Sequence, residues 1–235
     1  RYAGIVGTYN GLRAYGLRNK IFDLPKVESL PDMRQLLREL DKVVLPNLKI
    51  ILTGSGKVAH GAMEILDYLG IRKVGVTEYL KERFSEPVYC QIDVLDYNKR
   101  KDGKKGSNND FYRNAQQYIS DFMRFAEVSE IFIAGHYYGE GAPYFFTKKD
   151  VSSPDFRIKT IADISCDING PIATTVRAST IAEPFYGYDP KTGLETDFTD
   201  PDAISVMAVD NLPCELPKDA SEGFGEMFLD HVLPA

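Results

Sequence analysis

A glycine cluster separates a short apolar run from an amphipathic run in the stretch L-K-I-I-L-T-G-S-G-K-V-A-H-G-A-M-E-I-L, which starts at residue 48. The apolar run Lys49–Thr53 predicts a strand, and the spacing of apolar residues over Val58–Leu69 predicts a helix. In a strand–turn–helix unit, Gly54 permits the sharp turn, Gly56 lets a pyrophosphate approach the backbone, and Gly61 lets the helix pack closely on the sheet. The stretch therefore predicts a dinucleotide-binding unit, with a bare structural turn as the alternative.

The turn and the start of the helix supply the expected phosphate contacts. A helix N-terminus offers unpaired N–H groups and partial positive charge to an anion. Lys57 stands at this point and either contacts phosphate or is solvated. We expect the cofactor to contact five consecutive residues, Gly54, Ser55, Gly56, Lys57 and Val58.

A dinucleotide site also needs a carboxylate at the end of the second strand, where it hydrogen-bonds the adenosine ribose. The run K-V-G-V-T-E predicts a short second strand over Lys73–Thr77, and Glu78 is its nearest carboxylate. Glu78 comes late relative to the strand end, so the choice between NAD and NADP stays open on this pattern.

The rest of the chain continues the alternation of helices and strands. Frequent small residues from Tyr2 to Leu17 predict a helix packed very closely on a neighbour. The other predicted segments are a helix over Pro31–Val44 capped by Ser29, an exposed loop over Tyr97–Asp110, a helix through Ala115–Ala126, and strands over Glu130–Gly135, Lys159–Ile164 and Ile204–Val209. This order predicts an α/β fold, a Rossmann-like doubly wound parallel sheet with N-terminal and C-terminal helical extensions.

Charge and composition exclude several classes of function. The net charge of −6 argues against nucleic acid as a partner, because phosphate binding needs a basic surface. No apolar run approaches the ~20 residues of a membrane helix, and no signal peptide is visible. Three scattered cysteines and three histidines fit neither a disulfide framework nor a zinc site. We expect reduced thiols, no metal and a cytoplasmic protein.

Three longer strings carry a family resemblance: I-A-D-I-S-C-D-I-N-G-P-I, S-T-I-A-E-P-F-Y-G-Y-D-P and V-M-A-V-D-N-L-P-C-E-L-P-K-D-A-S-E-G-F-G. With A-G-I-V-G-T-Y-N-G-L and F-I-A-G-H-Y-Y-G-E-G-A-P, they make the chain resemble the saccharopine dehydrogenase and lysine–2-oxoglutarate reductase family. That family is related to alanine dehydrogenase and to the nucleotide domain of transhydrogenase. The resemblance covers nearly the whole chain.

The resemblance implies further cofactor contacts at matching positions. Gly56 and Lys57 match positions that hold the pyrophosphate, and Tyr137 matches a position that lines the cofactor. Ile161 and Asp163 match the strand on the nicotinamide side. The V-D-N-L loop, which is expected to close over the nicotinamide and its ribose, supplies Val209, Asp210, Asn211 and Leu212.

Two residues are weaker candidates for contact with substrate. His136 follows a predicted strand, where α/β folds place ligands, and is either an acid–base group or a contact of the cofactor. Asp167 lies in the turn D-I-S-C-D and either faces the cleft or caps the turn.

The resemblance also implies a division of the chain and an activity. Residues 1–45 are expected to link to an N-terminal domain that the chain lacks, 46–200 to form the Rossmann domain, and 201–235 to form the cofactor-closing loop and a C-terminal helix. Family members are NAD- or NADP-dependent oxidoreductases of lysine metabolism that act on CH–NH donors such as saccharopine. Their catalytic residues lie in the N-terminal domain, so this chain alone is expected to turn over no substrate.

Two alternatives remain on the sequence alone. An alanine dehydrogenase-like enzyme would use the same cofactor on a smaller amino acid, and a non-catalytic nucleotide-binding subunit would use the glycine-rich first helix as an interface. The expected partners are an amino-acid substrate and, as an open option, a second copy in a homodimer, with no nucleic acid and no membrane.

Overall fold

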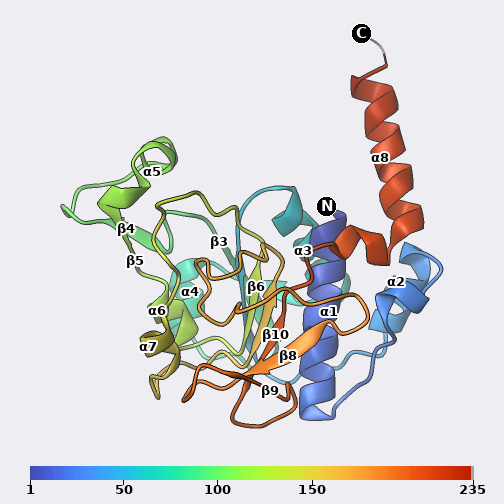
Figure 1. Cartoon of the computed structure of the whole chain (residues 1–235), viewed down its shortest axis with the longest axis horizontal. Coiled ribbons are helices and arrows are strands. Elements are labelled where there is room, and N and C mark those ends of the chain that lie inside the picture. Colours follow the sequence, from blue (N-terminus) through green and yellow to red (C-terminus); the bar gives the residue numbers. More distant parts are fainter. Residues whose placement is uncertain (234–235) are drawn as a thin grey trace.

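An eight-stranded, mostly parallel sheet forms the centre of the computed structural model, which describes residues 1–233 (Figure 1). Its strands lie in the order β2-β3-β1-β6-β7-β10-β8-β9, and β8 runs antiparallel to both of its neighbours, β10 and β9. The strands are β1 Lys49–Thr53, β2 Arg72–Lys73, β3 Val88–Ile92, β6 Ile131–Ala134, β7 Thr160–Asp163, β8 Phe185–Tyr188, β9 Glu195–Thr196 and β10 Ile204–Met207. The predicted α/β class with a Rossmann-like sheet is confirmed.

Helices cover both faces of the sheet, with α1 and α2 on the right in Figure 1 and α4, α6 and α7 on the left. The helices are α1 Tyr2–Asn19, α2 Met33–Leu40, α3 Lys57–Tyr68, α4 Val76–Lys81, α5 Asn108–Arg113, α6 Met123–Ala126, α7 Lys148–Val151 and α8 Pro217–His231, with 3-10 turns η1 Val27–Ser29, η2 Ala115–Gln117 and η3 Leu212–Glu215. Successive residues of β1 enter opposite cores: Ile51 packs with the α4 and α6 side, and Ile50 and Leu52 pack with the α1 and α3 side.

The first helix packs backbone to backbone on α3, as its small residues predict. A Cβ atom at Gly4 would lie 1.9 Å from the Val58 carbonyl oxygen, and one at Gly61 would lie 2.1 Å from the Arg1 carbonyl oxygen. Further along α1, a Cβ at Gly11 would lie 2.7 Å from that of Ala162 in β7. Glycine at these positions therefore lets α1 lie directly on α3 and on the sheet.

The predicted helix over Pro31–Val44 is shorter in the structure. Residues Met33–Leu40 form α2, and Asp32 rather than Ser29 caps it, because the Asp32 carboxylate accepts the Gln35 amide at 3.1 Å.

The predicted second strand over Lys73–Thr77 is wrong beyond its first residue. Strand β2 ends at Lys73, and Val76–Lys81 forms α4 instead. The sequence analysis missed β3, which lies between β2 and β1 and pairs in parallel with both. The second strand along the chain is thus an exposed sheet edge, and β3 is the neighbour of β1.

The predicted loop over Tyr97–Asp110 and the predicted helix through Ala115–Ala126 are also partly wrong. Two short strands, β4 Asn98–Arg100 and β5 Tyr118–Ser120, pair antiparallel and enclose α5 and η2. We call residues 98–120 the β4–β5 arm; it projects at the upper left in Figure 1. Phe111 and Tyr118 are both buried, with ring centroids 5.1 Å apart, and both belong to the core on the α4 and α6 side of the sheet.

The C-terminal helix is present and extends away from the body (Figure 1). None of the α8 residues is buried. Within residues 1–233 no helix has the length and apolar character to cross a membrane. The division of the chain at residues 45 and 200 stays a prediction, and residues 234 and 235 of its last part lie outside the described range.

Substituting Gly4 with alanine should lower the free energy of unfolding by at least about 1–3 kcal/mol, because the new methyl group overlaps the Val58 carbonyl. Urea unfolding monitored by circular dichroism measures the change. The control is Gly225→Ala in α8, where a Cβ meets no atom of the described residues within 4 Å. Equal unfolding midpoints for Gly4→Ala and the parent would contradict the close packing of α1 on α3.

Candidate functional site

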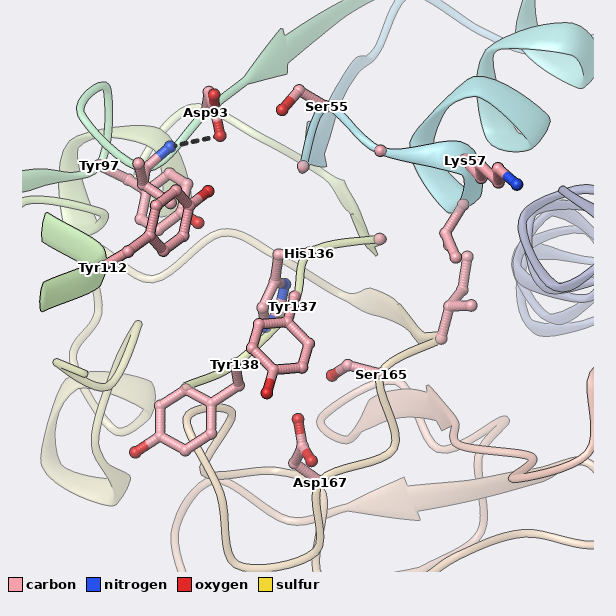
Figure 2. A pocket seen from close by; sticks show the side chains of 16 residues that line it. Ser55, Lys57, Asp93, Tyr97, Tyr112, His136, Tyr137, Tyr138, Ser165 and Asp167 are labelled. Atoms are coloured by element: carbon pink, nitrogen blue, oxygen red, sulfur yellow. Dashed lines mark hydrogen bonds between the residues drawn. The ribbon is translucent and has the colours of Figure 1, made fainter. Parts of the chain in front are cut away.

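A cleft of about 570 Å³ lies at the carboxyl edge of the parallel strands (Figure 2). Because β1, β3, β6 and β7 run parallel, the segments that follow them meet at this edge. Ligand pockets of this size and place are typical of open α/β sheets. The lining comes from the turn after β1 (Gly54–Val58), the segment after β3 (Asp93, Val94 and Tyr97), α5 (Tyr112), the segment after β6 (Gly135–Tyr138) and the segment after β7 (Ile164, Ser165 and Asp167).

The turn after β1 is held between the two neighbouring strands. The Gly54 amide donates to the Ile92 carbonyl at 2.9 Å, and the Gln91 side chain donates to the Gly54 carbonyl at 2.8 Å. Gly54 has φ +102°, and a Cβ there would lie 2.4 Å from the Gly135 carbonyl oxygen. Glycine is therefore required at 54 by the backbone of the protein itself.

Gly56 is different, because nothing in the fold requires it. A Cβ at Gly56 would meet no atom of residues 1–233 within 4 Å, and its φ of −88° suits any residue. The next three amides begin α3, and none finds an acceptor in the described part of the chain. Open space over unpaired amides at the start of a twelve-residue helix fits a bound pyrophosphate.

Lys57 is exposed and lines the same end of the cleft, as the sequence predicts for a phosphate contact. Ser55 and Val58 line it as well, so all five predicted residues of the turn meet at one place.

Among the described residues, the acid that lines the cleft after the strand beside β1 is Asp93, and Glu78 does not line the cleft. Glu78 lies in α4, is absent from the cleft lining and pairs with Arg72 at 3.0 Å. Asp93 directly follows β3, the neighbour of β1, and lines the cleft together with Ser55, at the top in Figure 2. The ribose acid of this fold must follow the strand beside β1, and only the sheet order identifies that strand. The signal in the sequence was the apolar run V-Y-C-Q-I ending in an aspartate.

Asp93 is half-buried and held by hydrogen bonds on both oxygens. The Val94 amide donates to Oδ1 at 2.8 Å, and the Asn108 side chain donates to Oδ2 at 3.2 Å. Each carboxylate oxygen keeps a further lone pair for a hydroxyl group in the cleft.

His136 is a neutral residue in the wall of the cleft. Burial lowers its pKa to about 3, Nδ1 lies 2.9 Å from Thr53 Oγ1, and the ring packs on Phe145 with centroids 4.3 Å apart. Nε2 is buried without a partner among the described residues. A histidine this hard to protonate is a poor proton donor at neutral pH, so the geometry favours contact with a ligand over acid–base chemistry.

Tyrosine and carboxylate side chains gather at the opposite end of the cleft from Asp93 (Figure 2). Tyr137 is 84% exposed, as expected for a ligand contact, and Tyr138 donates to the Ala142 carbonyl at 3.2 Å. Asp167 also lines the cleft, and burial raises the pKa of its carboxyl group. The sequence analysis missed Tyr138 and Ser165.

Ile161 and Asp163 do not line the cleft. Ile161 is fully buried in the core on the α6 side, and Asp163 is buried at the end of β7. The Asp163 carboxylate accepts the Ser165 hydroxyl at 2.6 Å and the Thr175 hydroxyl at 2.6 Å, so it fixes the turn that carries Asp167. Contact of either residue with the cofactor stays a prediction.

The V-D-N-L loop follows β10 and lies beside the same turn. The Cys166 thiol donates to the Ala208 carbonyl, with 3.0 Å between sulfur and oxygen, and Val209 forms a parallel bridge with Ser179. Val209 and Leu212 are buried, whereas Asp210 and Asn211 are exposed, and none of the four lines the cleft. Closure of this loop over the nicotinamide also stays a prediction.

The sheet order and the ligand-accessible glycine turn define a Rossmann-like α/β protein. No protein-family model matches the chain. The curated relatives that match it include alpha-aminoadipic semialdehyde synthase of Arabidopsis thaliana (28% identity, 79% of the chain), alpha-aminoadipic semialdehyde synthase of Rattus norvegicus (26%, 98%) and saccharopine dehydrogenase [NAD(+), L-lysine-forming] of Neurospora crassa (25%, 99%). The matches support the saccharopine dehydrogenase family of lysine-metabolism oxidoreductases, as the sequence strings predict. The chain spans 19%, 29% and 55% of the lengths of these three relatives.

Substituting His136 with glutamine should remove a pH dependence of stability. The folded pKa of about 3 lies below the unfolded value near 6.5, so the unfolded state takes up the proton first as pH falls. As the pH falls from 6.5 to 5, the free energy of unfolding of the parent should therefore decrease by about 2 kcal/mol. The variant should not show this decrease. Urea unfolding at several pH values measures this difference. Parallel pH profiles for the two proteins would show that His136 is not held neutral.

Proposed function

We propose that the cleft binds a nicotinamide dinucleotide and that the chain is the nucleotide-binding part of an oxidoreductase acting on saccharopine or a related amino acid. The observation that carries the proposal is the open space at Gly56 over the start of α3, with Asp93 on the neighbouring strand. The names of the relatives support the lysine-related substrate class.

The lining residues divide the cleft by chemistry. The α3 N-terminus and Lys57 would hold the pyrophosphate through N–H groups and positive charge. Asp93 would accept hydroxyl groups of the adenosine ribose, which leaves Tyr137, Tyr138 and Asp167 for the nicotinamide half. The bound cofactor would supply hydride transfer, and the protein would supply orientation and exclusion of water.

We propose NAD rather than NADP as the preferred cofactor. A carboxylate hydrogen-bonds a ribose hydroxyl but repels a 2′-phosphate. Lys57 is the one lysine or arginine among the described residues that line the cleft, and it lies at the pyrophosphate end, away from Asp93.

Lys57, assigned to the pyrophosphate, is the sole lysine or arginine among the described lining residues, so none is left for a substrate with several carboxylates. We therefore propose that the acid–base and carboxylate-binding groups come from outside the matched part of the relatives, in keeping with the expected N-terminal domain. The same shortage of cationic groups favours a second candidate function, a non-catalytic nucleotide-binding subunit.

A turnover assay of the chain with NADH, lysine and 2-oxoglutarate should show no oxidation of NADH above the protein-free rate.

Substituting Gly56 with alanine should weaken binding of NADH by at least about 1–3 kcal/mol and leave the urea midpoint unchanged, because the methyl group enters ligand space only. Calorimetric titration measures the affinity. The matched variant Gly54→Ala should instead destabilise the fold. If Gly56→Ala binds NADH as tightly as the parent, the pyrophosphate lies elsewhere.

Substituting Asp93 with asparagine should weaken the binding of NADH by about 1.5–3 kcal/mol, the range for hydrogen bonds to a charged group. The same substitution should reduce the preference for NADH over NADPH. The control is Glu78→Gln, which should change neither affinity. Tighter binding of NADPH by the parent, or a larger effect of Glu78→Gln than of Asp93→Asn, would refute the proposed role of Asp93.

A further inference from the structure

One wall of the cleft is not part of the sheet and its helices. Tyr112 lies on α5 in the β4–β5 arm, 61% exposed, and lines the cleft together with Asp93, Val94 and Tyr97 (Figure 2). Tyr97 is buried against Phe145, with ring centroids 4.7 Å apart, so it belongs to the floor. Phe111 and Tyr118 of the arm are buried as well, so Tyr112 is the aromatic ring of the arm that remains available to a ligand.

The arm is fixed in place by its own polar network. Arg100 pairs with Asp102 at 2.8 Å and with Asp110, and the Tyr118 hydroxyl donates to Asp110 at 2.6 Å. The Asn108 side chain, in the same helix as Tyr112, donates to Asp93 at 3.2 Å. The arm is thus tied directly to the carboxylate of the cleft, and the Tyr112 ring is held beside it.

Packing within the protein does not account for the position of the Tyr112 side chain. Its ring meets Phe111 edge to face at 5.8 Å, and its hydroxyl has no hydrogen bond to any of residues 1–233. Partial burial and the nearby Asp93 carboxylate raise the pKa of its hydroxyl, so the phenol stays neutral. A neutral aromatic face beside the ribose acid has the chemistry to stack on a purine base.

We propose that Tyr112 stacks on the adenine ring of the bound nucleotide, so that the β4–β5 arm, and not the sheet, recognises the base. This inference rests on the proposed dinucleotide site and adds a residue that selects adenine nucleotides. Tyr112 is a positioning residue and takes no part in hydride transfer.

A fluorescence experiment tests the stacking, because the natural chain contains no tryptophan. In the variant Tyr112→Trp, ADP-ribose should quench the single indole, whereas nicotinamide mononucleotide, which has no base at that end, should not. The control is Tyr68→Trp at the far end of α3, where ADP-ribose should leave the emission unchanged. Equal emission of Tyr112→Trp with and without saturating ADP-ribose would overturn the proposal.

Affinities separate this proposal from the one on which it rests. Tyr112→Ala should raise the Kd for ADP-ribose and for NADH roughly thirtyfold, the middle of the range for loss of one aromatic–base stack, with no change for nicotinamide mononucleotide. Tyr112→Phe should bind as the parent does. Parent-like binding by Tyr112→Ala, or equal weakening of nicotinamide mononucleotide, would refute the stacking and leave the nucleotide site intact. Failure of the parent to bind either ADP-ribose or NADH would refute the nucleotide site itself, and the stacking with it.

Discussion

The backbone contact between α1 and α3 sets the position of everything at the cleft. Gly4 and Gly61 bring the two helices so close that any side chain at either position would meet a main-chain atom. Since α3 follows directly from the turn at Gly54, the placement of its axis also fixes where its first amides point. A packing interaction between two helices thus helps to fix the direction of the amides at which the pyrophosphate is proposed to bind.

The wall of the cleft has two parts, the turn after β1, which is held in the sheet, and the β4–β5 arm, which is attached to the sheet. The turn after β1 is held between β3 and β6 by main-chain hydrogen bonds and by the close approach of Gly54 to Gly135. The β4–β5 arm leaves the sheet directly after the Asp93 segment and returns to it before β6. In the proposed arrangement the pyrophosphate contacts come from the turn after β1 and the start of α3, and the stacking contact with the base comes from the arm.

The sequence pattern predicted the secondary structure correctly where a segment's conformation depends on residues close to it in the chain. The strand Lys49–Thr53, the turn at Gly54 and the helix after it follow from apolar spacing and from steric requirements within a few residues. The prediction chose Glu78, which does not line the cleft, because strand order is a non-local property: β3 lies between β1 and β2, and β2 precedes β3 in the chain. Tyr112 was missed for a similar reason, because its neighbour Asp93 lies far from it in sequence and only the arm's antiparallel pairing brings them together.

The same strand order has a consequence during synthesis on the ribosome. Strand β1 pairs with β3 on one edge and with β6 on the other, so one edge stays open until residue 134 has emerged. Residue 134 follows the end of β1 by about 80 residues, which corresponds to roughly 4–16 s of elongation at ordinary rates. The contact between helix α1 and β7 forms later still, because Gly11 packs on Ala162 and Ala162 is synthesised after residue 134. During that interval α1 can pack on α3, but the face that later contacts β7 is still uncovered, and exposed apolar surface of this kind makes a partly made chain prone to aggregation.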